Sequence, residues 1–338
     1  MIRIENFLVS LEVRKGLRIS LFIYFALRDM STTCDTASSK LPFVIAIFGF
    51  GNFGQFLGRA FKNLRGSEVR LVAASRTDYS SLGICDQFYP SASALLEGET
   101  NLDVLLFCVS IKSLESVISG FPFGLLGPRT PLVVEVCSVK QLPKAILHKY
   151  VPANLSIFLT HPMFGPNTAG VDKDSSWQGK RMIYDFSLLN PSRYQTTPAT
   201  ETKQGESQVK TPAQIQAKEF LNLFSARQAT MVELNCEEHD ALAAKTQFLT
   251  HFLSQSLKPM LIDTQVDTTS YNRLKDTLGL VRGCSTDLYH GLYLYNVGSC
   301  ESMLDELQNT ISQARQQLKT LTQDNQAASD TPTENKSS

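Results

Sequence analysis

A histidine stands where an apolar stretch of the chain ends. His161 follows the run from Leu155 to Thr160 and opens the segment "HPMFGP", and the chain has only five histidines in 338 residues. Because histidine titrates near neutral pH, one placed here could accept or donate a proton in catalysis. A lone polar residue at a strand end is also common in sites without chemistry, so the surrounding sequence has to decide.

Polar side chains also end other apolar runs. Ser110 follows "DVLLFCV", Ser138 follows "PLVVEVC" with Lys140 two residues later, and Thr160 and His161 end "LSIFLTH". In open α/β sheets, ligands bind outside the carboxyl ends of the strands. Three such exits on successive strands predict a single pocket that contains His161.

The segment "GFGNFG" (49–54) is a G-x-G-x-x-G motif that directly follows a predicted strand and opens a predicted helix. In this context the motif indicates dinucleotide binding, because glycines allow a tight turn and a close approach of the backbone to a pyrophosphate at the helix N-terminus. A tight turn without a ligand is the alternative. The residues predicted to hold the pyrophosphate are Gly49, Gly51, Asn52, Phe53 and Gly54.

The end of the second predicted strand bears on which dinucleotide binds. NAD-binding chains usually place an Asp or Glu about 20 residues after the motif, against the ribose 2′-hydroxyl. This chain has Ser75, Arg76 and Thr77 there. A guanidinium pairs with a 2′-phosphate, which predicts NADP, with Ser110 also near the cofactor. In the alternative, Arg76 is a solvated surface residue and Asp78 contacts the ribose.

The elements that must position these residues alternate along the chain. Apolar runs at 43–48, 69–75, 103–110, 131–138 and 155–161 are separated by helical patterns, as in a doubly wound, mostly parallel sheet. We therefore predict an α/β Rossmann domain over 41–189, with one more strand possible in 181–189. A polar segment, 190–213, is predicted to be a flexible insertion.

Beyond the insertion the patterns are mostly helical, apart from a short strand in "TMVELN". Asn235 can cap a long helix, and another helix is expected from Asp287 to about Thr322. We predict an all-α dimerisation and substrate domain over 214–322 and a disordered tail, 323–338. The helices after residue 236 are too apolar for a solvated surface, which predicts a homodimer.

Composition excludes several classes of function. The 32 basic and 32 acidic residues cancel, so neither nucleic acid nor an anionic membrane surface is an expected partner. No apolar run reaches the roughly 18 residues of a membrane-spanning helix. The seven scattered cysteines form no C-x-x-C pair and read as reduced thiols, so neither a disulfide framework nor a metal site is expected. Residues 1–40 are interpreted equally well as a targeting leader or as an extension before a start at Met30.

Seven segments of this chain together closely resemble the arogenate/prephenate dehydrogenase family, in particular its plant-type, NADP-dependent arogenate dehydrogenases. They occur in order from about residue 43 to 310: "GFGNFGQFL", "SRTDYS", "EVCSVKQLPK", "THPMFGP", "MVELNCEEHD", "TQFLTH" and "DLYHGLYLYN". The resemblance implies a Rossmann domain followed by a dimerising helical domain. It also implies oxidation of L-arogenate to L-tyrosine with loss of CO₂, and a location in the plastid, with the cytoplasm as the alternative.

The resemblance also implies roles for individual residues. His161 matches the catalytic histidine, which takes the proton of the substrate hydroxyl, and Ser138 matches its companion serine. The substrate contacts expected besides these come from Thr160, Gln247, His251, Arg282 and Asp287. Arg282 would meet the ring carboxylate, although a solvated position explains it equally well. His239 is expected to be a helix-start residue rather than a ligand.

Asp287 is predicted to favour arogenate over prephenate, because an acid complements the ammonium that only arogenate carries. The rival interpretation makes Asp287 a helix N-cap, and prephenate dehydrogenase stays open as an alternative activity. Imine reductases and β-hydroxyacid dehydrogenases have a similar domain order. They would need a catalytic Lys or Asp on the first helix of the second domain, where Lys245 is the nearest candidate. A non-enzymatic NADP sensor is disfavoured by the polar strand exits.

Overall fold

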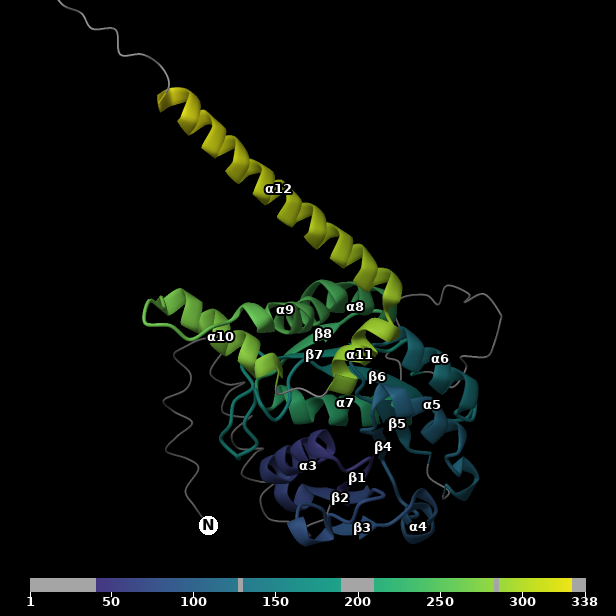
Figure 1. Cartoon of the computed structure of the whole chain (residues 1–338). Coiled ribbons are helices and arrows are strands. Elements are labelled where there is room, and N and C mark those ends of the chain that lie inside the picture. The colour runs from purple at the N-terminus through teal and green to yellow at the C-terminus, as the bar shows by residue number, and fades with distance from the viewer. Residues whose placement is uncertain (1–40, 127–129, 190–209, 283–285, 330–338) are drawn as a thin grey trace, which may run out of the picture. The chain divides into compact units, whose positions relative to one another are not determined.

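The computed structural model describes residues 41–126, 130–189, 210–282 and 286–329 (Figure 1). The predicted leader, the insertion up to residue 209 and the tail from residue 330 lie outside the described residues. None of the described helices is long and apolar enough to cross a membrane.

An eight-stranded sheet in the order β3-β2-β1-β4-β5-β6-β7-β8 organises the fold. Strands β1 to β6 pair in parallel, β7 runs antiparallel to β6, and β8 is parallel to β7. This is the mostly parallel, doubly wound sheet predicted from the alternation of apolar runs. The strands are β1 (Phe43–Phe48), β2 (Val69–Ala74), β3 (Gln87–Tyr89), β4 (Val104–Phe107), β5 (Leu132–Glu135), β6 (Ile157–Pro162), β7 (Arg181–Asp185) and β8 (Thr230–Glu233).

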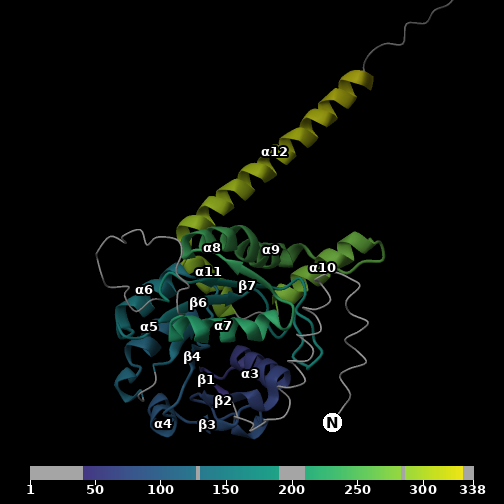
Figure 2. The same ribbon diagram turned by 180° about the vertical axis from the view of Figure 1, so that it is seen from behind.

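Helices cover both faces of the sheet, which explains why the strands read as continuous apolar runs. In β1, Ile45 and Ile47 face the layer that contains α3 (Asn52–Arg65) and α7 (Pro212–Ser225), while Val44 and Ala46 face the other layer. Figure 2 shows α7 lying along the sheet beside α3. The opposite layer contains α4 (Ala92–Gly98), α5 (Ile111–Ser119) and α6 (Gln141–Tyr150).

The sheet extends past the predicted boundary of the first domain. Strand β8, which the sequence predicts within the helical domain, pairs with β7 at the sheet edge. Helix α7 also belongs to the sheet layer, because its Phe220 packs edge-on against Phe61 of α3 and Phe158 of β6. The polar segment 190–213 is therefore an insertion within the sheet domain, and the helical part begins after β8.

The helical part starts with α8 (Cys236–Ala243), whose N-cap is Asn235 as predicted: the Asn235 side chain accepts from the Glu238 amide at 2.8 Å. The predicted single helix from Asp287 to Thr322 is divided by Asn296, whose Nδ2 donates to the carbonyl oxygen of Asp240 at 2.7 Å. The remaining elements are the π-helical segment η5 (Ala244–Phe248), α9 (Leu249–Leu257), η6 (Lys258–Met260), α10 (Thr269–Arg282), α11 (Thr286–Leu294) and α12 (Val297–Ser329). Helix α12 continues into the tail predicted to begin at residue 323.

A buried arginine fixes the loop that follows His161. Arg227 is only 2% exposed, and its guanidinium lies over the ring of Trp177 with 5.1 Å to the ring centroid. Its two terminal nitrogens donate at 2.6–3.0 Å to the carbonyl oxygens of Ala60, Val171, Asp172 and Ser175. The arginine thereby joins the β6–β7 loop to α3, the helix opened by the glycine motif.

We expect Arg227→Met to lower the free energy of unfolding by at least about 3 kcal/mol, because the substitution leaves buried carbonyl groups without a donor. Urea denaturation followed by circular dichroism measures the loss. Arg59→Met, at an exposed arginine of α3, is the matched control and should change stability by no more than about 0.5 kcal/mol. A loss under about 1 kcal/mol for Arg227→Met would contradict the assigned role.

Candidate active site

The turn between β1 and α3 is built around its glycines. Gly49 has φ +93°, and a Cβ there would lie 2.7 Å from the carbonyl oxygen of Cys108. A Cβ on Gly54 would lie 2.5 Å from the carbonyl oxygen of Gly49, whereas one on Gly51 would meet nothing within 4 Å. Gly49 and Gly54 thus allow the close packing of the turn, while the space beside Gly51 is open.

The start of α3 suits an anionic ligand. Gly51 is the N-cap of α3, no side chain caps this helix end, and the first turn contains no acidic residue. The N-terminal amides and the positive end of the helix dipole are therefore directed at the open space beside Gly51. Asn52 and Phe53 form the first turn. The residues present fit the pyrophosphate of a dinucleotide.

The segment after β2 lies at the same edge of the sheet. Arg76 and Thr77 are exposed and Ser75 is half-buried. Within the described ranges, no hydrogen bond or ion pair engages the Arg76 guanidinium. Asp78, the rival candidate for the ribose, accepts a hydrogen bond from the Ser80 amide at 2.8 Å. Of these two charged side chains, Asp78 therefore already has a hydrogen-bond partner among the described residues, and Arg76 does not.

A buried ion pair joins the exits of β5 and β6. Glu135 is 0% and Lys140 2% exposed, and the Lys140 ammonium donates both to the Glu135 carboxylate and, at 2.5 Å, to the carbonyl oxygen of Thr160. The Thr160 hydroxyl donates to the carbonyl oxygen of Glu135 at 2.7 Å. These bonds hold Ser138 and His161 on adjacent strand exits. The hydroxyl proton of Thr160, a predicted substrate contact, is thus used between the two strands.

His161 is the first member of a buried chain of hydrogen bonds that ends on a carboxylate. Its Nδ1 lies 2.9 Å from Nε2 of His239, and Nδ1 of His239 lies 2.8 Å from an oxygen of Asp240. The exposed fractions of the three residues are 4%, 3% and 0%. His161 comes from β6 and the other two residues from α8. The sheet domain and the helical part therefore meet at this series of hydrogen bonds.

The carboxylate assigns the protons of both rings. Asp240 can only accept, so the facing Nδ1 of His239 carries a proton and donates. In a neutral His239 ring, Nε2 then has a lone pair and accepts from Nδ1–H of His161. The remaining nitrogen of His161, Nε2, is left with a lone pair. His161 is thereby held in one orientation, with Nε2 as an acceptor that makes no hydrogen bond to another described residue.

Burial of His161 lowers the pKa of its imidazole well below the ordinary value, and the neighbouring His239 and Lys140 lower it further. The uncharged, proton-accepting form of His161 therefore predominates at neutral pH. An oriented and uncharged imidazole is the form that general base catalysis requires.

Two serines were predicted at strand exits. Ser138 is 7% exposed, and its hydroxyl makes no hydrogen bond to another residue in the part of the chain that is described. Its hydroxyl is thus available to a ligand beside His161. Ser110 is the N-cap residue of α5, and its exposed hydroxyl lies 3.0 Å from that of Ser113.

The helical part contributes Gln247 and His251. Gln247 lies in the π-helical segment η5, and its buried Oε1 has no hydrogen-bond partner among the described residues. His251 in α9 is 5% exposed and stacks on the Tyr289 ring, with 6.2 Å between the centroids. Single turns of π-helix occur often at functional sites, and an unpaired buried acceptor is a candidate ligand contact.

The predicted charged contacts lie at the ends of α10 and α11. Arg282 is the last residue of α10, and its side chain lies outside the described part. Asp287, 59% exposed, is in the first turn of α11, and its Oδ1 lies 2.6 Å from the ammonium of Lys112 in α5. The lysine holds the pKa of Asp287 below its ordinary value. Asp287 therefore already holds one ammonium group in this structure.

Lys245, the residue that an imine reductase or β-hydroxyacid dehydrogenase would need, points elsewhere. Its side chain is 58% exposed, and its ammonium lies 2.9 Å from a carboxylate oxygen of Glu306 in α12. An exposed, ion-paired lysine on this side of η5 gives no support to those alternatives.

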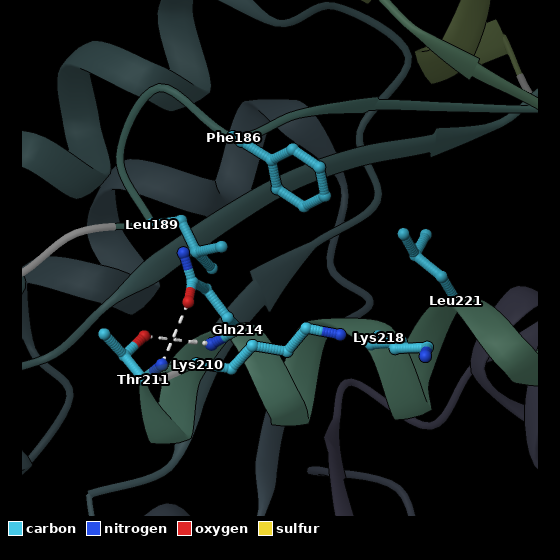
Figure 3. Close-up of a pocket in the computed structure, with 7 residues that line it drawn as sticks. All are labelled: Phe186, Leu189, Lys210, Thr211, Gln214, Lys218 and Leu221. Carbon is cyan, nitrogen blue, oxygen red and sulfur yellow. Dashed lines mark hydrogen bonds between the residues drawn. The ribbon is translucent and has the colours of Figure 1, made fainter. Parts of the chain in front are cut away.

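A cavity of about 590 Å³ lies beside the N-terminal half of α7 (Figure 3). None of the predicted site residues lines it. Thr211 and Gln214, which do, bond to each other's backbone amides in a capping box and so satisfy their own helix end. The cavity is therefore separate from the residues that suggest chemistry.

Sequence reasoning missed several residues of the site. The sequence predicts His239 only as a helix-start residue and gives no role to Asp240, yet together they orient His161. Their adjacency in the first turns of a capped helix was the only signal. Glu135 was also missed, because its partners Lys140 and Thr160 are identified only once β5 and β6 are paired.

Known proteins resemble this chain in sequence and in fold. Residues 256–330 match the family model described as "TYRAAT1-like, C-terminal domain". The chain is 35% identical over 282 residues to arogenate dehydrogenase 1, chloroplastic, of Arabidopsis thaliana, a match that covers 82% of this chain and 40% of that protein. It is 36% identical over 262 residues to arogenate dehydrogenase 2, chloroplastic, of the same plant, covering 77% and 65%. The chain thus spans less than two thirds of the length of these relatives.

Among solved structures, prephenate dehydrogenase from A. aeolicus in complex with hydroxyphenyl propionate and NAD+ has the same fold. It superposes with a TM-score of 0.60 at 17% identity, covering 85% of this chain and 93% of that one. Over most of its length the chain is thus a homologue of the plant arogenate dehydrogenases, and it has the fold of a prephenate dehydrogenase.

Proposed function

We propose that this chain oxidises L-arogenate to L-tyrosine, with loss of CO₂ and with NADP as the hydride acceptor. The observation that carries the proposal is the buried series of hydrogen bonds from Asp240 through His239 to His161, which leaves Nε2 of His161 as an acceptor on the strand exit next to that of Ser138. The names of the two plant relatives and the open glycine turn support the substrate and the cofactor class.

The chemistry needs a group that removes the proton of the substrate's ring hydroxyl. The bound nicotinamide supplies the acceptor for the hydride that leaves the carbon bearing that hydroxyl. Nε2 of His161 takes the hydroxyl proton as the C–O bond gains double-bond character, and Ser138 holds the same oxygen in place. The bond to the ring carboxylate then breaks, CO₂ leaves, and its electron pair completes the aromatic ring.

The proton balance fits a buried base. Arogenate loses CO₂ and a hydride but no net proton, so the proton that His161 removes can return to the phenolate oxygen. While His161 is charged, its Nδ1–H still donates to Nε2 of His239, which is oriented by the Asp240 carboxylate. No route for protons to solvent is required.

The substrate side chain would be met by the helical part. Asp287 can exchange the ammonium of Lys112 for that of arogenate, and the unpaired Oε1 of Gln247 is a second acceptor for an N–H donor. His251 and Arg282 are proposed to contact the carboxylates. Prephenate has a keto group in place of the ammonium and would leave such acceptors without a donor.

A homodimer is proposed from exposed apolar side chains of the helical part. Large apolar residues at the surface from η6 to the end of α10 include Met260, Ile262, Val266 and Leu280, with exposed fractions of 70%, 61%, 84% and 57%. Apolar surface of this kind marks contacts between proteins. A plastid location is proposed from the names of the plant relatives. Imaging a fluorescent fusion that starts at Met1 beside one that starts at Met30 tests that location.

His161→Asn should lower kcat on arogenate by about a hundredfold or more, because asparagine cannot accept the proton, whereas NADPH binding should stay within a factor of about three. Steady-state rates and the fluorescence of bound NADPH measure the two effects. His148→Asn, at an exposed histidine of α6, is the control and should retain full activity. A fall of less than about fivefold for His161→Asn would refute the role of the base.

Arg76→Ala should raise the Michaelis constant for NADP at least about tenfold and leave that for NAD unchanged, since only NADP carries the 2′-phosphate. Arg59→Ala removes a comparable exposed charge from α3 and should alter neither constant. Equal constants for NADP in the Arg76 variant and the unmodified protein would show that the 2′-phosphate is bound elsewhere. A preference of the unmodified protein for NAD would overturn the cofactor proposal.

The ratio of kcat/KM for arogenate to that for prephenate should exceed about ten and should fall severalfold in Asp287→Asn. The control Lys112→Met removes the competing ammonium and should preserve the preference. Preference for prephenate by the unmodified protein would favour the alternative activity. An unchanged ratio in Asp287→Asn would leave the function in place and exclude this residue as its cause.

A further inference from the structure

The C-terminal two thirds of α12 carry an apolar stripe that the described parts of the chain do not cover. At its start, Met303 is buried, and Leu304 and Leu307 pack partly against the core of the helical part. From Gln308 onward, every residue of α12 whose side chain is described is exposed. Ile311, Leu318 and Leu321 have exposed fractions of 58%, 66% and 59%. In a helix surrounded by water, such a row of apolar side chains would remain unfavourably exposed.

The spacing of the stripe identifies the kind of partner. Apolar residues recur alternately after three and four positions, which is the a/d pattern of a heptad repeat: Leu304, Leu307, Ile311, Ala314, Leu318 and Leu321. A seven-residue period does not follow a straight α-helix of 3.6 residues per turn but a helix wound around a second one. Figure 1 draws α12 as one uninterrupted helix, as a coiled-coil strand requires.

The residues beside the stripe allow the partner to be an identical helix. Among the e and g positions whose side chains are described, four of the five are uncharged, and Arg315 is the exception. Two copies can therefore approach without opposing rows of like charge, and no row of charges selects a different, oppositely charged helix. These positions are Gln308, Thr310, Arg315, Gln317 and Thr322.

One polar residue continues the pattern. Asn325 occupies the next a position after Leu318, within α12. A single asparagine at an a position favours two parallel strands in register, because the two side chains then meet each other. We propose that α12 of two copies forms a parallel, two-stranded coiled coil over residues 308–325, where the stripe leaves the core of its own chain. This contact is additional to the proposed dimer surface around η6 and α10, and it rests on the proposed function only in that both describe a homodimer.

Disulfide trapping in the full chain tests the register. Ala314→Cys places a thiol at a d position and should give a covalent dimer on mild oxidation, whereas Gln316→Cys, at an f position on the far side of the same turn, should not. Non-reducing gel electrophoresis reads the result, and the unmodified chain gives the background from its own cysteines. Equal trapping at both positions, or none at either, overturns the proposal. So does a disulfide from Ala314→Cys that peptide mapping joins to a native cysteine elsewhere in the chain.

A second pair of variants separates this contact from folding and from catalysis. Ile311→Asp with Leu318→Asp should raise the dimer dissociation constant at least about a hundredfold, as measured by sedimentation. Asn309→Asp with Gln316→Asp adds the same charge at f positions and should leave it within about threefold. Because all four sites are exposed, circular dichroism should show an unchanged fold. Activity with arogenate and NADP in the same samples reports the proposed function separately: an active protein whose dimer is unaffected by the first pair overturns the coiled coil alone.

Discussion

The rest of this site depends on the hydrogen bonds that the Asp240 carboxylate accepts. One oxygen accepts from the Lys140 amide at 2.7 Å and from His239, and the other accepts from the Gln141 amide at 3.0 Å. A single side chain of α8 thus caps α6, which follows β5 in the sheet domain. The carbonyl oxygen of the same residue receives Asn296, where α11 gives way to α12. An ionised group that is 0% exposed is tolerated because its acceptor positions are filled by donors at a helix N-terminus and by an imidazole.

Because of this arrangement, His161, the proposed base, is oriented only when the helical part packs against the sheet domain. The sheet domain alone would place His161 at the exit of β6 with either ring nitrogen free to carry the proton. Packing of α8 against the strand exits supplies His239, and Asp240 then determines which nitrogen of each ring is protonated. The Glu135–Lys140 pair works on the sheet side, because it keeps the exits of β5 and β6 together and so fixes Ser138 relative to His161.

The features that sequence predicted well are local ones. The strand, turn and helix around Gly49 to Gly54 follow from residues within one short segment, and the Asn235 cap follows from three neighbouring positions. The polar strand exits were also visible, since parallel strands bring their carboxyl ends to one edge. The pairing of His161 with His239 was not, because the two residues are 78 positions apart and belong to different parts of the fold. The same limit explains why the position of β8 in the sheet was not predicted. A strand of four residues is too short for its sequence to show which strand it pairs with, and the polar insertion before it has the composition of a domain linker.

The burial of His161 explains why the site suits the proposed chemistry. A solvated histidine would exchange its proton with water and would be charged during part of its lifetime near neutral pH. Here burial, together with the neighbouring His239 and Lys140, disfavours the charged form before the substrate binds. The hydrogen bond from Nδ1 of His161 to His239 keeps the ring oriented while the proposed base accepts the hydroxyl proton. A reaction in which the proton is returned to the product oxygen can be completed inside such an enclosure, and the contact between α8 and the strand exits is what closes it.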